Sequence, residues 1–105
     1  MFNSSNLWTW IPDLKIQLIV WENEVLIFNR LTQDTHLLNK PADWILDKLN
    51  NNTLSVDELT KTAISQNIIP NDQDSFLYIN NFLTCLKEIN LIELTSNRYE
   101  DNSLA

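Results

Sequence analysis

The stretch Asp34-Thr35-His36-Leu37-Leu38-Asn39 decides the fold, because it joins a strand-rich first third of the chain to a helical remainder. It predicts a short strand over Asp34 to Leu38 that ends just before a proline-started helix. Asn39 is a suitable cap for that helix, and Pro41 would stand in its first turn, where a missing N–H does no harm. We therefore expect any function to lie along this strand.

Two further strand segments precede this stretch and predict a hairpin. Lys15 to Trp21 and Val25 to Asn29 are rich in Ile, Leu and Val, and a tight polar turn, Glu22-Asn23-Glu24, separates them. Both strands are apolar on both faces, whereas a small antiparallel sheet usually exposes one face to water. We expect the tryptophan-containing segment 1–14 to pack on this sheet, or a partner to cover it.

Three helices are predicted after the third strand. The first spans about Pro41 to Asn50, and the second starts with a capping box, Ser55 and Glu58. The third is the longest, with Asn71 or Asp72 as its cap.

The chain contains no glycine, so asparagine is expected where the backbone turns left-handed. Asn23, Asn51 and Asn90 are placed for this role, and Asn90 ends the third helix. The order of these predicted elements, a three-stranded antiparallel sheet followed by three helices, indicates an α+β fold of the winged helix-turn-helix type. One domain covers 15–94, and a polar tail covers 95–105.

Composition excludes several classes of function. The 105 residues suffice for one domain, and fourteen acidic residues against seven basic ones give a net charge of −7. Nucleic acids and anionic membranes are disfavoured as partners, because both attract clustered Lys and Arg. No secretory signal or bilayer-length apolar stretch is visible, which indicates a cytoplasmic protein.

Catalytic chemistry has little support in the sequence. His36 is the only histidine, and together with Asp34 it does not make a metal site. Cys85 lies among apolar residues, where a thiol packs as a small hydrophobe. A phosphate-cradling glycine loop is impossible without glycine. We expect no enzyme, no cofactor and no metal.

Taken together, the third strand, the hairpin before it and the helix after it resemble a known family. The run Thr35 to Asn39, preceded by the hairpin from Trp21 to Phe28 and followed by a proline-started helix, resembles the PqqD family. It is most similar to the PqqD-type peptide chaperones of the HPr-related-A system, which are recognition elements for ribosomally made, modified peptides. The similarity spans about Trp8 to Leu94. Leu86 to Glu93 matches the family's helix end with Asn90 in place of glycine, and Gln33 stands where a turn glycine is common.

The resemblance implies a domain that binds the leader of a precursor peptide and presents it to a modifying enzyme of the same pathway. In that family the leader adds as a strand to the third strand and lies between it and the third helix. The implied peptide-binding residues here are Asp34, Thr35, His36, Leu37 and Leu38 on the strand, and Phe76, Ile79, Phe82, Leu83 and Leu86 on the helix. Strand alternation places Thr35 and Leu37 on one face and the other three on the opposite face.

Other interpretations stay open. Core packing is the alternative for each apolar residue of the third helix. The chain can also be a structural or regulatory subunit that docks permanently on a partner protein, and a homodimer is a further alternative. A winged-helix protein in transcription is a weaker alternative, because Asp72, Asp74 and Glu88 would oppose phosphates. An unpaired edge at Asp34 to Leu38 favours peptide binding, whereas coverage by the tail from Thr95 to Ala105 argues against it.

Overall fold

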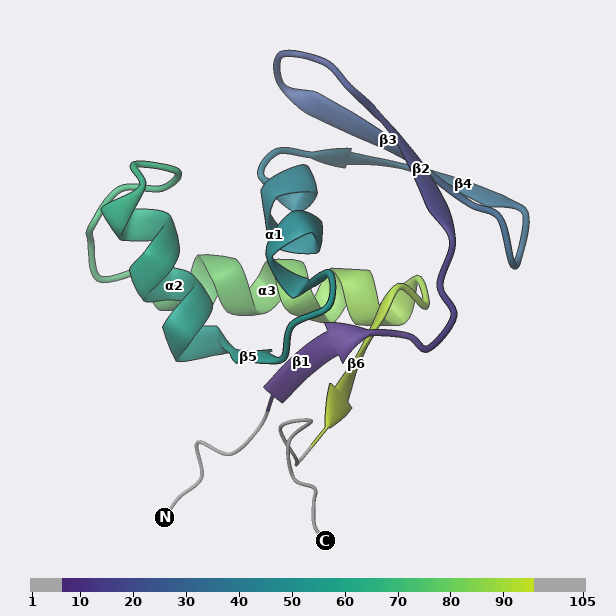
Figure 1. The fold of residues 1–105 in the computed structure, drawn as a ribbon. Coiled ribbons are helices and arrows are strands. Elements are labelled where there is room, and N and C mark those ends of the chain that lie inside the picture. Colours follow the sequence, from purple (N-terminus) through teal and green to yellow (C-terminus); the bar gives the residue numbers. More distant parts are fainter. Residues whose placement is uncertain (1–6, 96–105) are drawn as a thin grey trace, which may run out of the picture.

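The computed structural model describes residues 7–95, which form two small antiparallel sheets and three helices (Figure 1). The first sheet contains β2 (Ile16–Val20), β3 (Glu24–Asn29) and β4 (Asp34–Asn39), in the order β2-β3-β4. Its hairpin and third strand confirm the sequence prediction. β3 is therefore the central strand, and β2 and β4 are the two outer strands.

The second sheet was not predicted. β1 (Leu7–Trp10) is its central strand and pairs with β5 (Leu54–Ser55) on one side and β6 (Ile92–Thr95) on the other. The sequence predicted that the tryptophan segment packs on the first sheet, but it did not anticipate that β1 would pair in a sheet of its own. The rest of that segment, residues 1–6, and the expected tail from 96 onward lie outside the described residues, and Thr95 belongs to β6.

The helices are α1 (Ala42–Leu49), α2 (Val56–Ser65) and α3 (Ser75–Glu88). The predicted capping box at the start of α2 is confirmed. Glu58 N–H donates to the Ser55 hydroxyl over 3.1 Å, and Ser55 N–H donates to a Glu58 carboxylate oxygen over 2.9 Å. This reciprocal pair satisfies two backbone donors that a helix start leaves without partners.

The other two helix starts differ from the prediction. Pro41, which follows a cis peptide bond, occupies the cap of α1 without a side-chain hydrogen bond, so Asn39 is not the cap. α3 begins at Ser75, later than a cap at Asn71 or Asp72 would place it. The Asp72 carboxylate accepts from Asp74 N–H over 2.9 Å, so Asp72 shapes the turn before the helix instead of capping it.

Left-handed backbone occurs at several residues in this glycine-free chain. Asn51 has a φ of 63° and Asn90 a φ of 65°, which confirms the expectation for these two asparagines. Gln33 has a φ of 68° in the turn between β3 and β4, so this turn uses glutamine at a left-handed position that glycine would adopt more readily. Asn23 lies outside the left-handed region, so the prediction for that residue is wrong.

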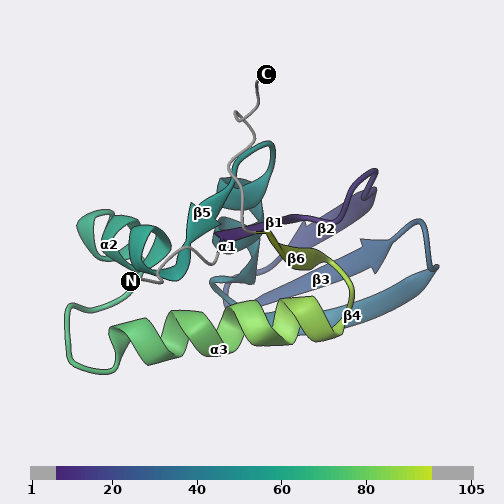
Figure 2. The same ribbon diagram turned by 90° about the horizontal axis from the view of Figure 1, so that it is seen from below.

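One apolar core lies between the inner face of β3, the three helices and β1. Val25 and Ile27 of β3 are fully buried against it, as is Leu46 of α1. The Trp10 indole N–H donates to the Leu46 carbonyl over 2.9 Å and so ties the second sheet to α1. Figure 2 shows α3 running beneath the first sheet on the side of β4. Within residues 7–95, no helix has the length and apolar character needed to cross a membrane.

Candidate functional site

The outer edge of β4 is the first part of the candidate site. Lys40 N–H donates to the Asn23 carbonyl over 3.1 Å, so these two residues form a hydrogen-bonded pair at the end of the β3–β4 ladder. In an antiparallel ladder such pairs recur at every second residue, which directs the backbone groups of His36 and Leu38 toward β3. The N–H and C=O groups of Leu37 consequently point away from the sheet. Among the described residues no strand pairs with this edge.

The side chains of β4 alternate as the sequence predicted. Thr35 and Leu37 are exposed on the outer face, Leu37 with 55% of its surface accessible. His36 and Leu38 are half-buried on the inner face, where His36 lies opposite the buried Ile27. Asp34 shares that face by parity but is exposed at the start of the strand. The strand therefore presents backbone groups at its edge and different chemistry on its two faces.

An aromatic flank of α3 lies beside the end of β4. The rings of Tyr78 and Phe82 pack edge to face with centroids 5.3 Å apart. The Tyr78 hydroxyl donates a long hydrogen bond of 3.5 Å to the carbonyl of Lys40, the residue that follows β4. Sequence reasoning missed Tyr78, although its spacing of four residues from Phe82 is the signal that places both on one flank of a helix.

The predicted helix residues divide into three groups. Ile79, Leu83 and Leu86 are completely buried, so they face the core and can only support a peptide site from behind. Phe82 is partly buried and belongs to the aromatic flank. Phe76 is 51% exposed, but at 100° per residue it lies about 160° around the helix from Tyr78. Phe76 is therefore not brought together with β4.

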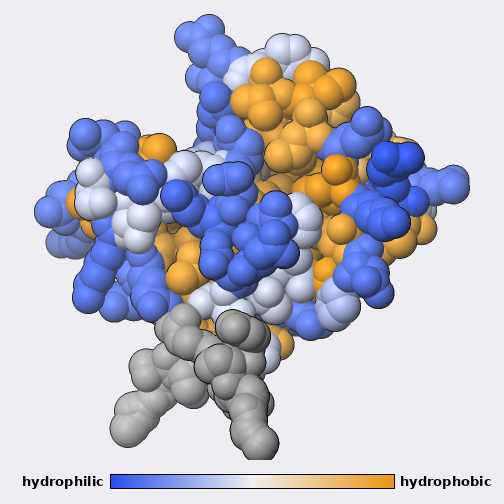
Figure 3. All heavy atoms as spheres, in the orientation of Figure 1, coloured by the Kyte–Doolittle hydropathy of each residue, from blue (hydrophilic) through white to orange (hydrophobic). Residues whose placement is uncertain are grey.

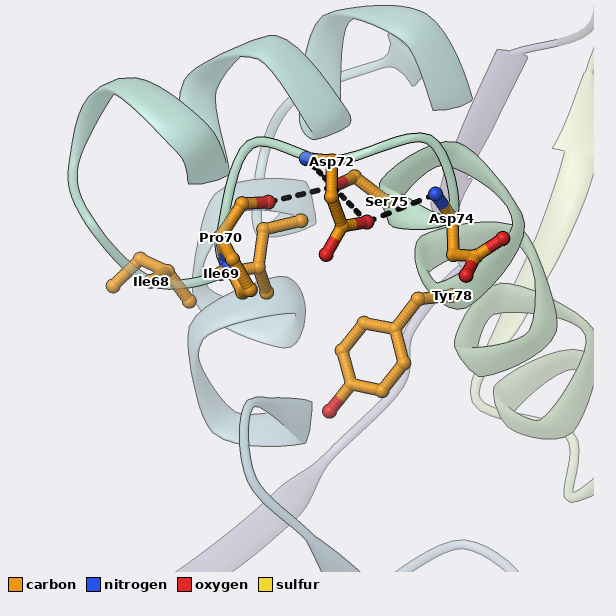
Figure 4. Close-up of a pocket in the computed structure, with 7 residues that line it drawn as sticks. All are labelled: Ile68, Ile69, Pro70, Asp72, Asp74, Ser75 and Tyr78. Atoms are coloured by element: carbon orange, nitrogen blue, oxygen red, sulfur yellow. Dashed lines mark hydrogen bonds between the residues drawn. The ribbon is translucent and has the colours of Figure 1, made fainter.

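A pocket of about 250 Å³ adjoins the aromatic flank at the turn between α2 and α3 (Figure 4). Tyr78 forms one wall, and the remaining lining residues are Ile68, Ile69, Pro70, Asp72, Asp74 and Ser75. The buried Ser75 hydroxyl donates to the Pro70 carbonyl over 2.6 Å and accepts from Asp72 N–H over 3.1 Å. These bonds hold the turn in place, and its pocket is small enough to take one side chain rather than a cofactor.

The two residues singled out for chemistry lie apart from any cluster of metal-ligating side chains within residues 7–95. His36 is half-buried, and Cys85 lies partly buried on α3. Among residues 7–95 no three His, Cys, Asp or Glu side chains lie close enough together to hold a metal ion.

No family model, curated protein or solved structure matches this chain. The resemblance to the PqqD family thus rests on short motifs, above all on the run Thr35 to Asn39. The geometry adds two features to these motifs. One is an outer strand with free backbone groups, and the other is the Tyr78 and Phe82 flank beside its end.

Proposed function

We propose that this chain is a non-enzymatic peptide chaperone. It binds the leader of a ribosomally made, post-translationally modified peptide as an added strand on β4, and it presents that peptide to a modifying enzyme. The observation that carries the proposal is the outer edge of β4, where Thr35 and Leu37 direct their N–H and C=O groups away from β3. Strand addition requires such a row of unpaired backbone groups.

The two faces of β4 give the bound peptide an orientation. Successive peptide side chains point to opposite faces of the enlarged sheet. One set lies on the inner face, beside Leu38 and the aromatic flank of Tyr78 and Phe82. The other set lies beside Thr35 and Leu37, which are exposed. We infer that the inner set is apolar and selective and that the outer set tolerates many residues. A site of this kind binds with about −8 to −12 kcal/mol, in the micromolar to nanomolar range.

The finer fold that accompanies this function is a winged helix-turn-helix. In support of this, α2 and α3 are consecutive helices joined by residues 66–74. We do not assign nucleic acid as the partner. Asp72 and Asp74 precede α3, and Glu88 ends it beside Lys87, so phosphates would meet mainly acidic groups.

A second function is favoured by a separate observation. Ile19, Trp21 and Leu37 each expose half or more of their surface on the outer face of the first sheet. A large apolar surface of this kind is typical of proteins that dock on a partner. A structural or regulatory subunit, bound permanently through this face, would hide these residues without using the β4 edge for a peptide.

Amide chemical-shift mapping tests the proposal and separates the two functions. The probe is a synthetic leader peptide from a precursor encoded beside this chain. We expect shifts at Thr35 and Leu37, where new backbone hydrogen bonds form, and at Tyr78 beside them. The amides of β2 on the opposite edge serve as the internal control and should not move. If the perturbed amides avoid both β4 and α3, the peptide-recognition function is wrong.

A further inference from the structure

The opposite outer strand, β2, also has an open edge. Trp21 N–H donates to the Glu24 carbonyl and Arg30 N–H donates to the Lys15 carbonyl, each over 2.8 Å. The ladder between these two pairs places the backbone groups of residues 17 and 19 toward β3. The N–H and C=O groups of Ile16, Leu18 and Val20 therefore point outward. Within residues 7–95 no strand pairs with them.

This edge lacks the devices that usually prevent strand pairing. Outer strands commonly carry charges or proline, but the run from Ile16 to Trp21 contains neither. Its apolar side chains are open to solvent, with Leu18 37%, Ile19 53%, Val20 46% and Trp21 50% exposed. Figure 3 shows an apolar patch at the end of the molecule that this hairpin forms.

The charges at the two ends of β2 are opposite in sign. Lys15 and Arg30 face each other across the ladder at one end. Glu22 and Glu24 lie at the other end, where Glu24 faces Trp21. All four charged side chains are exposed, and none of them forms an ion pair within the described part of the chain. An antiparallel pairing of two β2 strands brings the basic end of one copy against the acidic end of the other, whereas a parallel pairing brings like charges together.

We propose that β2 pairs with β2 of a second copy, antiparallel, with Leu18 on the two-fold axis. In this register every outward N–H and C=O group of one copy faces a hydrogen-bonding partner in the other. Ile16 pairs with Val20 of the second copy, and Leu18 pairs with its own equivalent. It also sets the ammonium group of Lys15 beside the Trp21 ring of the partner copy, a favourable cation–π arrangement. The result is a continuous six-stranded sheet. Both β4 strands stay at its outer edges, so the dimer presents two peptide-binding edges related by the two-fold axis.

Engineered cysteines test the register. In a Cys85→Ser background, Leu18→Cys places two thiols directly opposite each other, with Cα atoms about 5.5 Å apart, within the range of a disulfide. Ile19→Cys is the matched control, because that residue faces Gln17 of the other copy and its own equivalent is about 8 Å away. Mild oxidation should cross-link the Leu18→Cys variant as a dimer and leave the Ile19→Cys variant as a monomer. Equal cross-linking at both positions, or none at either, overturns the proposal.

Sedimentation velocity at high micromolar concentration tests the dimer itself. Leu18→Lys sets two like charges together on the axis and should raise the dimer dissociation constant at least about 100-fold. Leu37→Lys, an equally polar change on the β4 edge, should leave the dimer intact. A chain that is monomeric without substitutions refutes the proposal, as does a dimer that survives Leu18→Lys. Peptide affinity at β4 is independent of either result.

Discussion

Replacing Leu37 by proline tests the docking edge of β4. The Leu37 N–H points away from β3, so proline removes no bond of the existing sheet, and the side chain is already 55% exposed. In a bound complex the same change removes the hydrogen bond that the Leu37 N–H would donate to the peptide. The proline ring also blocks the close approach of the peptide that the second backbone hydrogen bond, to the Leu37 carbonyl, requires. At about 1 kcal/mol for each bond, the loss is about 2 kcal/mol. We expect the peptide dissociation constant to rise about 30-fold.

Two other proline variants make this measurement interpretable. Leu18→Pro changes an outward N–H on the opposite edge and should leave the affinity for the peptide unchanged. Leu38→Pro removes a ladder bond to Val25 and should destabilise the sheet. Affinity is measured by isothermal titration calorimetry with the leader peptide, and folding by circular dichroism. A folded Leu37→Pro variant that binds within about threefold of the unmodified chain refutes strand addition at β4, since that difference is below one hydrogen bond.

The remaining predictions concern stability. Ser55→Ala removes the capping box at α2 and should cost about 1 kcal/mol, which lowers Tm in a thermal melt by about 4–8 °C. Asn90→Ala places alanine at a φ of 65°, a left-handed conformation that alanine adopts less readily than asparagine. We expect urea unfolding to show a free energy of unfolding lower by about 1 kcal/mol, whereas Asn90→Gly should not lower it. Ile27→Ala should cost about 2–5 kcal/mol because Ile27 is fully buried, whereas Ile19→Ala, at 53% exposure, should cost well under half as much; equal losses would contradict the placement of the core.

Local signals located the elements whose stabilising contacts are close in sequence. The hairpin around Glu22-Asn23-Glu24 needs only a short polar turn between two apolar runs, and the capping box needs only Ser55 and Glu58. The same holds for Asn90 at the end of α3, where a left-handed residue is required and glycine is missing. Strand parity likewise assigned the faces of β4 before any tertiary contact was known.

Tertiary structure alone decided the second sheet and the make-up of the candidate site. Leu7 pairs with Ser55 and with Thr95, and no local pattern reveals partners so far along the chain. The helix residues of the site depended on how α3 is rotated against the sheet. An apolar stripe shows that one side of a helix is buried, but not which flank lies beside β4. That rotation buried Ile79, separated Phe76 from the strand and brought in Tyr78, because the packing of the core, not the sequence of the helix, sets its orientation.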